Sequence, residues 1–376
     1  MSLLEKLLDS VIVEWRALES IAKIKHGKDW KGLDEGDVPV YGSGGIMGYV
    51  DTYSYNKPTV LIPRKGSITN VFYVDKPFWN VDTIYYTEIN NQVIIPKYFY
   101  YFITTIDLLS LDTGAGRPSL TQAILNKILV PIPCPDDPEK SLKIQSKIVQ
   151  ILDQFSTLTA ELTAELTAEL SMRKKQYNYY RDQLFSFEEG TVGWKPLGEL
   201  AENLDSKRKP ITSGLRDAGD IPYYGASGIV DYVKNYIFDG DFLLVSEDGA
   251  NLLARNTPIA FSISGKTWVN NHAHVLKFDT YAERKYVEYY LNSIDLTPYI
   301  SGAAQPKLNK KNLENISIPN PSIDEKVRIV SILDKFDALT SSITEGLPRE
   351  IVLRQQQYEY YRDLLFSFPK SETVVV

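Results

Sequence analysis

Cysteine is almost absent from this chain of 376 residues, and histidine is scarce. Cys134 is the single cysteine, and there are three histidines. One cysteine excludes both an intrachain disulfide and a cysteine zinc cluster, which suits the reducing conditions of the cytoplasm. Because 43% of the residues are hydrophobic, we expect a fold that is stabilised by an ordinary apolar core.

Long apolar runs and an excess of positive charge are absent as well. No segment approaches the ~18 uninterrupted apolar residues of a membrane span, and the apolar run at the start contains Glu5 and Asp9 without a basic n-region. We therefore expect neither a membrane role nor a secretory signal. The net charge of −7 excludes a chain that coats nucleic acid by bulk electrostatics, so nucleic-acid binding requires local basic loops or the charge of a partner.

Glycine and proline are both missing from residues 139–189. Their absence permits one helix of unusual length, because these two residues are the usual helix terminators. Asp137 supplies an N-cap for this helix, and Pro138 suits its first position.

The same segment contains a four-residue word repeated three times, TAELTAELTAEL at residues 159–170. Each unit adds about 6 Å to a helix, and its leucine returns to nearly the same face, with a drift of about 40° per repeat. This spacing favours an adjustable spacer. A solvent-facing helix that grew by replication slippage, and that measures no distance, is an open alternative.

The two halves of the chain repeat one another. The matches keep their order and lie at offsets of 181 to 183 residues. They pair VPVYGSGGIMGYV (38–50) with IPYYGASGIVDYV (221–233), IVQILDQF (148–155) with IVSILDKF (329–336), and QYNYYRDQLFSF (176–187) with QYEYYRDLLFSF (357–368). The chain is therefore a tandem duplication.

The second repeat also predicts a long helix near its end. Ser322 and Glu325 have the spacing of a capping box, which favours a helix start there. Gly346 and Pro348 interrupt the pattern that follows, so we expect the helix to break or kink at that point.

These patterns predict the fold class α+β. We expect two globular mixed α/β domains separated by two long helices, which form an antiparallel coiled coil with pseudo-two-fold symmetry. Two similar heads at a fixed separation suit duplex DNA that carries two half-sites. The expected ranges are 1–136 and 190–321 for the heads, 137–189 for the helical spacer, 322–368 for the C-terminal helical region and 369–376 for a flexible tail.

The duplicated ILD.F and QY.YYRD.LFSF motifs and the TAEL array resemble the specificity subunits of Type I restriction–modification systems. The array and SITEGLPREI, at residues 342–351, are similar to the subgroup called IC. The resemblance covers nearly the whole chain, and the helical motifs are its most specific part. It implies that the two heads are target-recognition domains without a catalytic site, which read an asymmetric, bipartite DNA sequence.

The resemblance also implies a set of partners and cofactors. Two modification subunits, which methylate adenine with S-adenosylmethionine, would bind this chain, and restriction subunits would join them to translocate and cut DNA with ATP and Mg²⁺. No cofactor is expected on the chain itself. The alternative is a stand-alone coiled-coil scaffold that binds proteins and has no DNA specificity.

Polar loop residues in the first head are the candidates for DNA contact. Arginine suits bidentate contact with guanine, and lysine, hydroxyl groups and glycine N–H groups suit phosphates. An ordinary charged hairpin tip or a structural turn is the alternative for each loop. The candidates are Ser43, Gly44, Arg64, Lys65, Ser67, Thr69, Asn70, Arg117 and Ser119.

The second head has different polar residues in the corresponding loops. Glutamine and asparagine can read adenine, and a carboxylate can accept from cytosine N4. Structural roles inside the fold are the alternative for this set. The candidates are Ser227, Ser246, Glu247, Asn251, Arg255, Asn271, His272, Gln305, Lys307 and Asn309.

Leucines and tyrosines at helical spacing are interpreted as packing residues, between the helices or toward partner subunits, rather than as base-stacking residues. They are Leu158, Leu162, Leu166, Leu170, Tyr177, Tyr180, Tyr358 and Tyr361.

Catalytic and metal-binding patterns are incomplete. AFSISGKT ends like a phosphate-binding loop, but Ala260 occupies its first glycine position. His272 and His274 have no evident third ligand nearby in the sequence. We therefore predict no catalytic residue and no metal.

Overall fold

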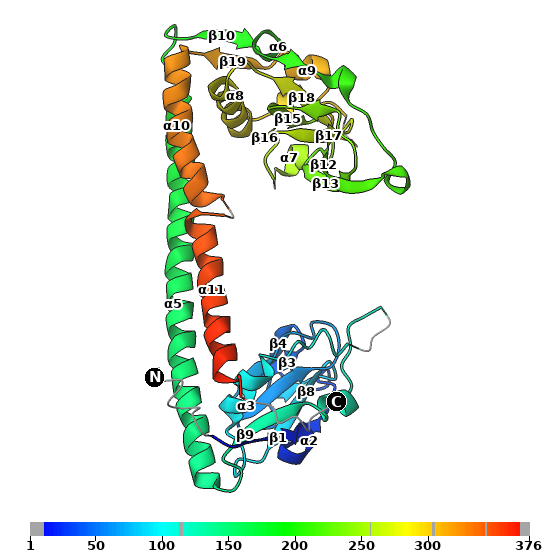
Figure 1. The fold of residues 1–376 in the computed structure, drawn as a ribbon, viewed down its shortest axis with the longest axis vertical. Helices are drawn as coiled ribbons and strands as arrows, with labels where there is room; N and C mark the ends of the chain where they lie inside the picture. Colours follow the sequence, from blue (N-terminus) through cyan, green and yellow to red (C-terminus); the bar gives the residue numbers. More distant parts are fainter. Residues whose placement is uncertain (1–10, 113–115, 256, 303–304, 343, 369–376) are drawn as a thin grey trace. The chain divides into compact units, whose positions relative to one another are not determined.

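The computed structural model describes residues 11–112, 116–255, 257–302, 305–342 and 344–368 (Figure 1). The chain forms two compact units, and each is described by itself. Unit 1 contains residues 1–165 and 351–376, and unit 2 contains residues 166–350. None of the described helices is long and apolar enough to cross a membrane.

The head of unit 1 consists of small, mainly antiparallel sheets with short helices. A four-stranded sheet has the order β2 (Ala22–Lys25), β8 (Ile84–Ile89), β5 (Thr59–Pro63), β6 (Phe72–Val74). A three-stranded sheet has the order β4 (Gly45–Val50), β3 (Val38–Gly42), β7 (Trp79–Asn80), and β1 (Val13–Ala17) pairs with β9 (Leu129–Pro133). The helices are α2 (Leu18–Ile21), α3 (Pro96–Ile103) and α4 (Gln122–Leu125).

The head of unit 2 has the same plan. Its first sheet has the order β11 (Glu202–Asn203), β18 (Ala273–Lys277), β15 (Phe242–Ser246), β16 (Ala260–Ile263). Its second sheet has the order β13 (Gly228–Val233), β12 (Ala218–Gly225), β17 (Lys266–Val269), β14 (Phe238–Asp239), and β10 (Gly193–Pro196) pairs with β19 (Ser317–Asn320). Its helices are α6 (Leu197–Leu200), α7 (Asn251–Ala254), α8 (Tyr281–Ser293) and α9 (Lys310–Glu314), with 3-10 turns η1 (Asp205–Lys207), η2 (Ser213–Leu215) and η3 (Thr297–Tyr299).

The strand registers confirm that the two heads are copies of one plan. β5 pairs with β8, and β15 pairs with β18, in corresponding antiparallel registers. Both heads also place one parallel pair in the second sheet, β3 with β7 and β12 with β17. Every residue of β5 and of β15 is buried, as the continuous apolar sequence of each strand requires. The expected mixed α/β fold with two tandem domains is therefore confirmed.

The core of each head includes a tyrosine on its main helix. Tyr98 of α3 and Tyr286 of α8 are both fully buried. Each hydroxyl donates a hydrogen bond of 3.0 Å to a strand carbonyl, at Pro131 and at Pro319 respectively. The bond gives the buried hydroxyl a partner and fixes the helix to the edge strand in both heads.

The long helix is α5, which runs over 47 residues from Pro138 to Leu184. The Asp137 carboxylate accepts the N–H of Lys140, and this bond caps the helix as the sequence predicts. In the second repeat, α10 (Ile323–Thr340) begins after Ser322, whose hydroxyl accepts the N–H of Glu325.

The predicted interruption of the second helical region is present. α10 ends at Thr340, and α11 runs from Gly346 to Leu365. The break therefore precedes Gly346 rather than following it. Pro348 lies in the first turn of α11, where its missing N–H costs no intrahelical bond.

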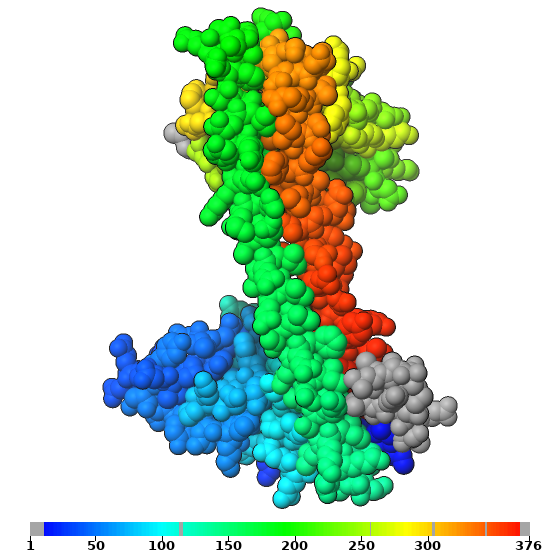
Figure 2. Space-filling view, turned by 90° about the vertical axis from the view of Figure 1, so that its left-hand side faces the viewer, coloured from blue at the N-terminus to red at the C-terminus, as the bar shows by residue number. Residues whose placement is uncertain are grey.

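Helix packing follows one pattern that appears in both units. In unit 1 the Phe155 ring on α5 stacks on Tyr361 of α11, with centroids 5.4 Å apart, and α11 lies directly against α5 (Figure 2). In unit 2 the Phe336 ring on α10 stacks on Tyr180 of α5 at 5.8 Å. Phe155 and Phe336 are equivalent in the duplication, as are Tyr180 and Tyr361, so one contact is made twice.

The other predicted packing residues differ in exposure. Tyr177 packs against the core of the second head, and Tyr358 is half-buried in unit 1. Leu162, Leu166 and Leu170 are half-buried, whereas Leu158 is exposed.

Candidate nucleic-acid interface

Three loops of the first head come together at one end of its sheet. The Gly66 N–H donates to the Pro118 carbonyl (3.0 Å), and the Leu120 N–H donates to the Arg64 carbonyl (2.7 Å). The Asn70 amide donates to the Ser43 carbonyl (3.1 Å), which joins the β3–β4 turn to the same cluster. Gly66 has φ +88°, a conformation in which other residues are strained. The structure therefore brings the first-head candidates into one loop cluster.

The remaining first-head candidates also belong to this cluster, and all of them are exposed except Ser119, which is half-buried. Gly44 lies in the β3–β4 turn, and Ser67 and Thr69 follow β5. Arg117 is exposed, and the backbone N–H of Ser119 donates to the Asp112 carboxylate at 2.7 Å. The loop has the sequence TGAGRPSL (113–120), and its residues 113–115 lie outside the described residues.

The cations of the first cluster share one carboxylate. Asp82 lies 2.8 Å from the Lys65 ammonium and 3.7 Å from the Arg64 guanidinium. The hydrogen bond from Lys65 is the main cause that lowers the pKa of Asp82. All three groups are partly exposed, and exposed ion pairs contribute only about 0 to 1 kcal/mol. An incoming anionic backbone can therefore replace Asp82 at low cost.

The second head has the opposite charge at the equivalent positions. Strand register places Glu247 where unit 1 has Arg64, and Asp248 where unit 1 has Lys65. The backbone of Asp248 forms an isolated antiparallel β-bridge with that of Lys307, and the backbone of Lys65 forms the equivalent β-bridge with that of Ser119. One loop plan thus has basic residues after the central strand in unit 1 and acidic residues in unit 2.

Glu247 is the centre of a buried ionic network. Its carboxylate lies 2.6 Å from Arg208 and 3.0 Å from Lys307. Burial acts to raise the pKa of Glu247, but the hydrogen bonds from Arg208 and Lys307 outweigh burial and lower it. The carboxylate is therefore held ionised inside the fold, where it fixes the loop that carries Lys307.

The lowered pKa of Glu247 predicts a pH dependence of stability. A group with a depressed folded-state pKa stabilises the fold above its unfolded pKa, near 4.3, and this contribution is lost as the pH falls through the folded value. The stability difference between the wild type and Glu247→Gln should therefore be full above about pH 5 and decline below about pH 4. Hydrogen exchange of peptides from β15 and β18 measures it. Glu161→Gln, on the exposed surface of α5, is the control, and a difference that is constant from pH 3 to 7 would contradict this prediction.

Four candidates of the second head make contacts within the fold. The Ser246 hydroxyl donates to the Ala226 carbonyl, and Asn251 exchanges two hydrogen bonds with the backbone of Thr257. Arg255 donates to carbonyl groups at the end of α8, and Asn309 is the N-cap of α9. These bonds give each side chain a structural role.

Two exposed candidates of the second head lie at a pocket of about 800 Å³. Gln305 and His272 line it, and the His272 ring nitrogen Nδ1 lies 2.9 Å from both oxygens of Asp248. Apolar side chains, including the exposed Leu253, form part of its wall. Ser227 and Asn271 are exposed in neighbouring turns. A polar rim beside apolar side chains can contact both the edge and the methyl group of a base.

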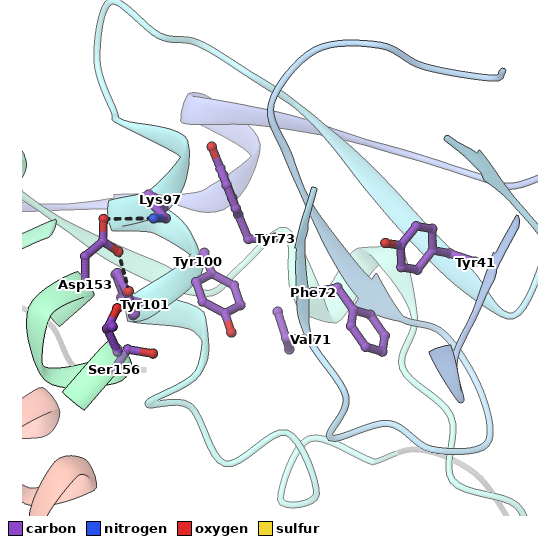
Figure 3. Close-up of a pocket in the computed structure, with 10 residues that line it drawn as sticks. Tyr41, Val71, Phe72, Tyr73, Lys97, Tyr100, Tyr101, Asp153 and Ser156 are labelled. Carbon is purple, nitrogen blue, oxygen red and sulfur yellow. Dashed lines mark hydrogen bonds and ion pairs between the residues drawn. The ribbon is translucent and has the colours of Figure 1, made fainter. Parts of the chain in front are cut away.

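Sequence reasoning missed the joint between head and helix. In unit 1 the Tyr101 hydroxyl donates to Asp153 of α5, and Lys97 pairs with the same carboxylate at 2.8 Å (Figure 3). Burial, followed by the bond to Asp153, raises the pKa of Tyr101. These residues line a pocket of about 530 Å³. The same joint is present in unit 2, where the Tyr289 hydroxyl donates to Asp334. The sequence signal that could have revealed it is the duplication, because both the tyrosine and the aspartate are repeated in the two halves of the chain.

His272 and His274, the H-x-H pair, have separate environments. His274 is buried, and its ring lies between Asp205 and Leu308. The ligand atoms of Asp205, Glu247 and His274 lie within 4.8 Å of one another. Two cationic side chains, Arg208 and Lys307, already neutralise these carboxylates, and both ring nitrogens have hydrogen-bond partners. This donor set does not fit a metal ion.

Comparison with known proteins shows the family. The family model of the Type I restriction modification DNA specificity domain matches residues 12–172 and again 191–353. The EcoR124I/EcoR124II specificity subunit of Escherichia coli is 40% identical over 410 residues, which cover 100% of this chain and 99% of that protein.

Two solved structures share the fold. One, from work on complex assembly and conformational transition of the type I R-M system, has a TM-score of 0.61 at 13% identity, with 94% of this chain and 97% of that chain covered. The S subunit from M. genitalium has a TM-score of 0.51 at 18% identity, with 99% and 100% covered. The duplicated heads, the loop clusters and the two family matches together define a two-domain DNA-recognition protein. The chain belongs to the family of Type I restriction–modification specificity subunits, which recognise DNA and are not catalytic.

Proposed function

We propose that this chain reads an asymmetric, bipartite DNA target, with one head for each half-site. The observation that supports this is the charge difference between equivalent loops. Arg64 and Lys65 follow the central strand in the first head, and Glu247 and Asp248 follow it in the second. Glu247 is buried in its ionic network, so of this acidic pair Asp248 is the residue that is partly exposed. Two recognition surfaces with one backbone plan and different exposed polar groups fit two half-sites of different sequence.

The first head offers donors to its half-site. Arg64 can donate two hydrogen bonds to guanine O6 and N7, while Lys65 and the hydroxyls of Ser67 and Thr69 suit phosphates. Asp82 holds both cations near the surface until DNA replaces it.

The second head offers a mixture of donors and acceptors. Gln305 and Asn271 can pair with adenine, and Asp248 can accept from cytosine N4. Lys307 supplies a local positive charge for a phosphate, since its side chain is half-exposed. The four side chains with contacts inside the fold are not needed for this proposal.

Two modification subunits and the restriction subunits are the proposed protein partners. Tyr179 and Tyr360 support two equal binding surfaces, since they occupy equivalent positions and are 62% and 64% exposed. S-adenosylmethionine, ATP and Mg²⁺ would be bound by these partners and not by this chain. A cytoplasmic location follows from this role, because the chromosome is there. Family membership does not favour the stand-alone scaffold.

The test is DNA binding by a complex of one specificity subunit with two modification subunits. The complex should bind target duplexes more tightly than random duplexes, and its affinity should fall as salt rises, because phosphate contacts release counterions. The subunit without partners, at net charge −7, should bind weakly. Equal affinity for every duplex sequence would exclude the proposal.

A further inference from the structure

The side chain of His274 is bound at both ring nitrogens inside the second head. It projects from β18 and is 1% exposed. Nδ1 lies 2.6 Å from the Asp205 carboxylate, and Nε2 lies 2.7 Å from the carbonyl oxygen of Leu308. The ring therefore connects the segment after β11 to the loop before α9.

Both ring nitrogens must carry hydrogen in this arrangement. A carbonyl oxygen only accepts, so Nε2 donates to Leu308. Asp205 accepts the N–H of Val275 with its second oxygen at 3.0 Å and lies 3.3 Å from Arg208. Those contacts identify Asp205 as an ionised acceptor, so Nδ1 also donates. A neutral imidazole has a single N–H, so both contacts are hydrogen bonds at the same time only when the ring is an imidazolium.

Charged groups surround this cation from every neighbouring element. Asp205 and Arg208 come from η1 and the residue after it, and Glu247 follows β15 at 3.8 Å from Nδ1. Lys307 reaches Glu247 from the loop before α9. The charges of Asp205 and Glu247 are balanced by those of Arg208 and Lys307, and a charged His274 adds one positive charge to the network.

The first head has an uncharged contact at the same place. Tyr85 occupies the position of His274 in the strand register, and its hydroxyl is 3.4 Å from the Leu120 carbonyl, the equivalent of Leu308. His26 lies where unit 2 has Asp205, and its ring meets Tyr85 edge-on at 5.0 Å. The link between sheet and loop is therefore present in both heads, and it is ionic only in the second.

The ionic link fixes a loop that carries recognition residues. The Leu308 N–H donates to the Glu247 carbonyl at 2.8 Å, while its carbonyl accepts from His274. Both backbone groups of Leu308 are therefore bound to the sheet. Lys307 precedes it, and Gln305 faces the pocket of the second head. A hydrogen bond from a charged donor contributes about 1.5 to 3 kcal/mol, compared with about 1 for a neutral one.

We propose that His274 is a positioning residue for DNA recognition by the second head, whose cationic ring between Asp205 and Leu308 holds the loop of Gln305 and Lys307 at the recognition surface. This inference rests on the proposed function, since the loop must first be a DNA-reading loop. His274 touches no DNA itself and acts through the backbone of Leu308.

The first test compares discrimination at the two half-sites. Complexes with two modification subunits are titrated with duplexes in which a single base of either half-site is changed. Gln305→Ala identifies the half-site that the second head reads. His274→Gln, which keeps one donor, should reduce discrimination at that same half-site on the order of tenfold and leave the other half-site unchanged. Tyr85→Phe is the matched control, and it should not affect the half-site of Gln305.

The outcomes separate the two hypotheses. No sequence preference by the wild-type complex would exclude the proposed function itself. Normal preference by the wild type, with unchanged discrimination at both half-sites in His274→Gln, would overturn the inference alone. An equal loss at both half-sites would show a general folding defect and would also contradict a positioning role.

The second test does not depend on a folded variant. The chain has three histidines, so ¹⁵N-histidine labelling gives three sets of ring signals. In the wild-type protein at neutral pH, one histidine should show two ring N–H signals, one from Nδ1 and one from Nε2. Both protons should exchange slowly with solvent. Observation of a single ring N–H, or of rapid exchange at both nitrogens in all three histidines, would overturn the cationic link.

Discussion

Deletion of one TAEL unit, residues 163–166, should shorten the preferred gap between the half-sites by one or two base pairs and leave both half-site sequences unchanged. The unit contributes four residues to α5, or about 6 Å of helix, which compares with ~3.4 Å per base pair. Methylation of DNA sites that have the original gap between their half-sites should therefore be lost almost completely. Four residues also rotate a helix by roughly 400°, so the change in gap should be an integer that restores groove alignment.

A control for the deletion must keep the helix length. Glu165→Gln changes the same unit at an exposed position without shortening α5, and it should leave the gap unchanged. The readout is methylation or binding on a set of duplexes whose gap varies one base pair at a time. Altered half-site bases with an unchanged gap would contradict the spacer role and would favour the alternative in which the repeat measures nothing.

The double variant Arg64→Ala, Lys65→Ala should lose recognition of one half-site. Each bidentate arginine contact with guanine is worth about 1 to 3 kcal/mol of discrimination, so a loss of roughly 10-fold to 100-fold is expected at that half-site. The dependence of affinity on salt should also weaken. The slope of the logarithm of the binding constant against the logarithm of the salt concentration should become less steep by about one unit for each lost phosphate contact. Binding of the assembled complex to duplexes with one altered half-site measures both effects.

Lys143→Ala is the matched control for this variant. Lys143 is an exposed lysine on the first turns of α5, paired with Glu139, and it lies outside both loop clusters. Its loss should change affinity little and discrimination not at all. An equal reduction at the two half-sites in the Arg64 and Lys65 variant would show that these cations serve only general attraction to DNA.

The architecture was largely predictable because it depends on short-range signals and on the duplication. The absence of glycine and proline between residues 139 and 189, with Asp137 and Pro138 before it, predicts the helix that the structure shows as Pro138–Leu184. The repeat of whole motifs predicts two copies of one domain. These signals need no knowledge of distant contacts.

The compact units were less predictable, because they depend on contacts across the chain. Unit 1 joins the first part of α5 with the end of α11, since Phe366 packs on Tyr98 and Phe102 of the first head. The QY.YYRD.LFSF motif that ends each repeat thus has its C-terminal phenylalanines in a head core. No local pattern reveals which head an apolar stretch contacts.

The candidate site was predictable to the level of loops and not of side chains. Sequence reasoning identified the loops after the central strands, and the structure brings them together in each head. It could not distinguish Gln305, which faces a pocket, from Asn309, which caps α9, because both are polar residues in one loop. Asp205 was missed entirely, since its role depends on His274, a residue far along the chain.

If one chain specifies both halves of a DNA target, genome-wide mapping of adenine methylation should reveal both half-sites in a single experiment. Cells that carry this chain with its modification subunit are compared with cells that lack only this chain. We expect a chain-dependent motif of two different half-sites separated by a gap of fixed length. Methylation that is unchanged by removal of the chain, with both proteins expressed, would contradict this expectation.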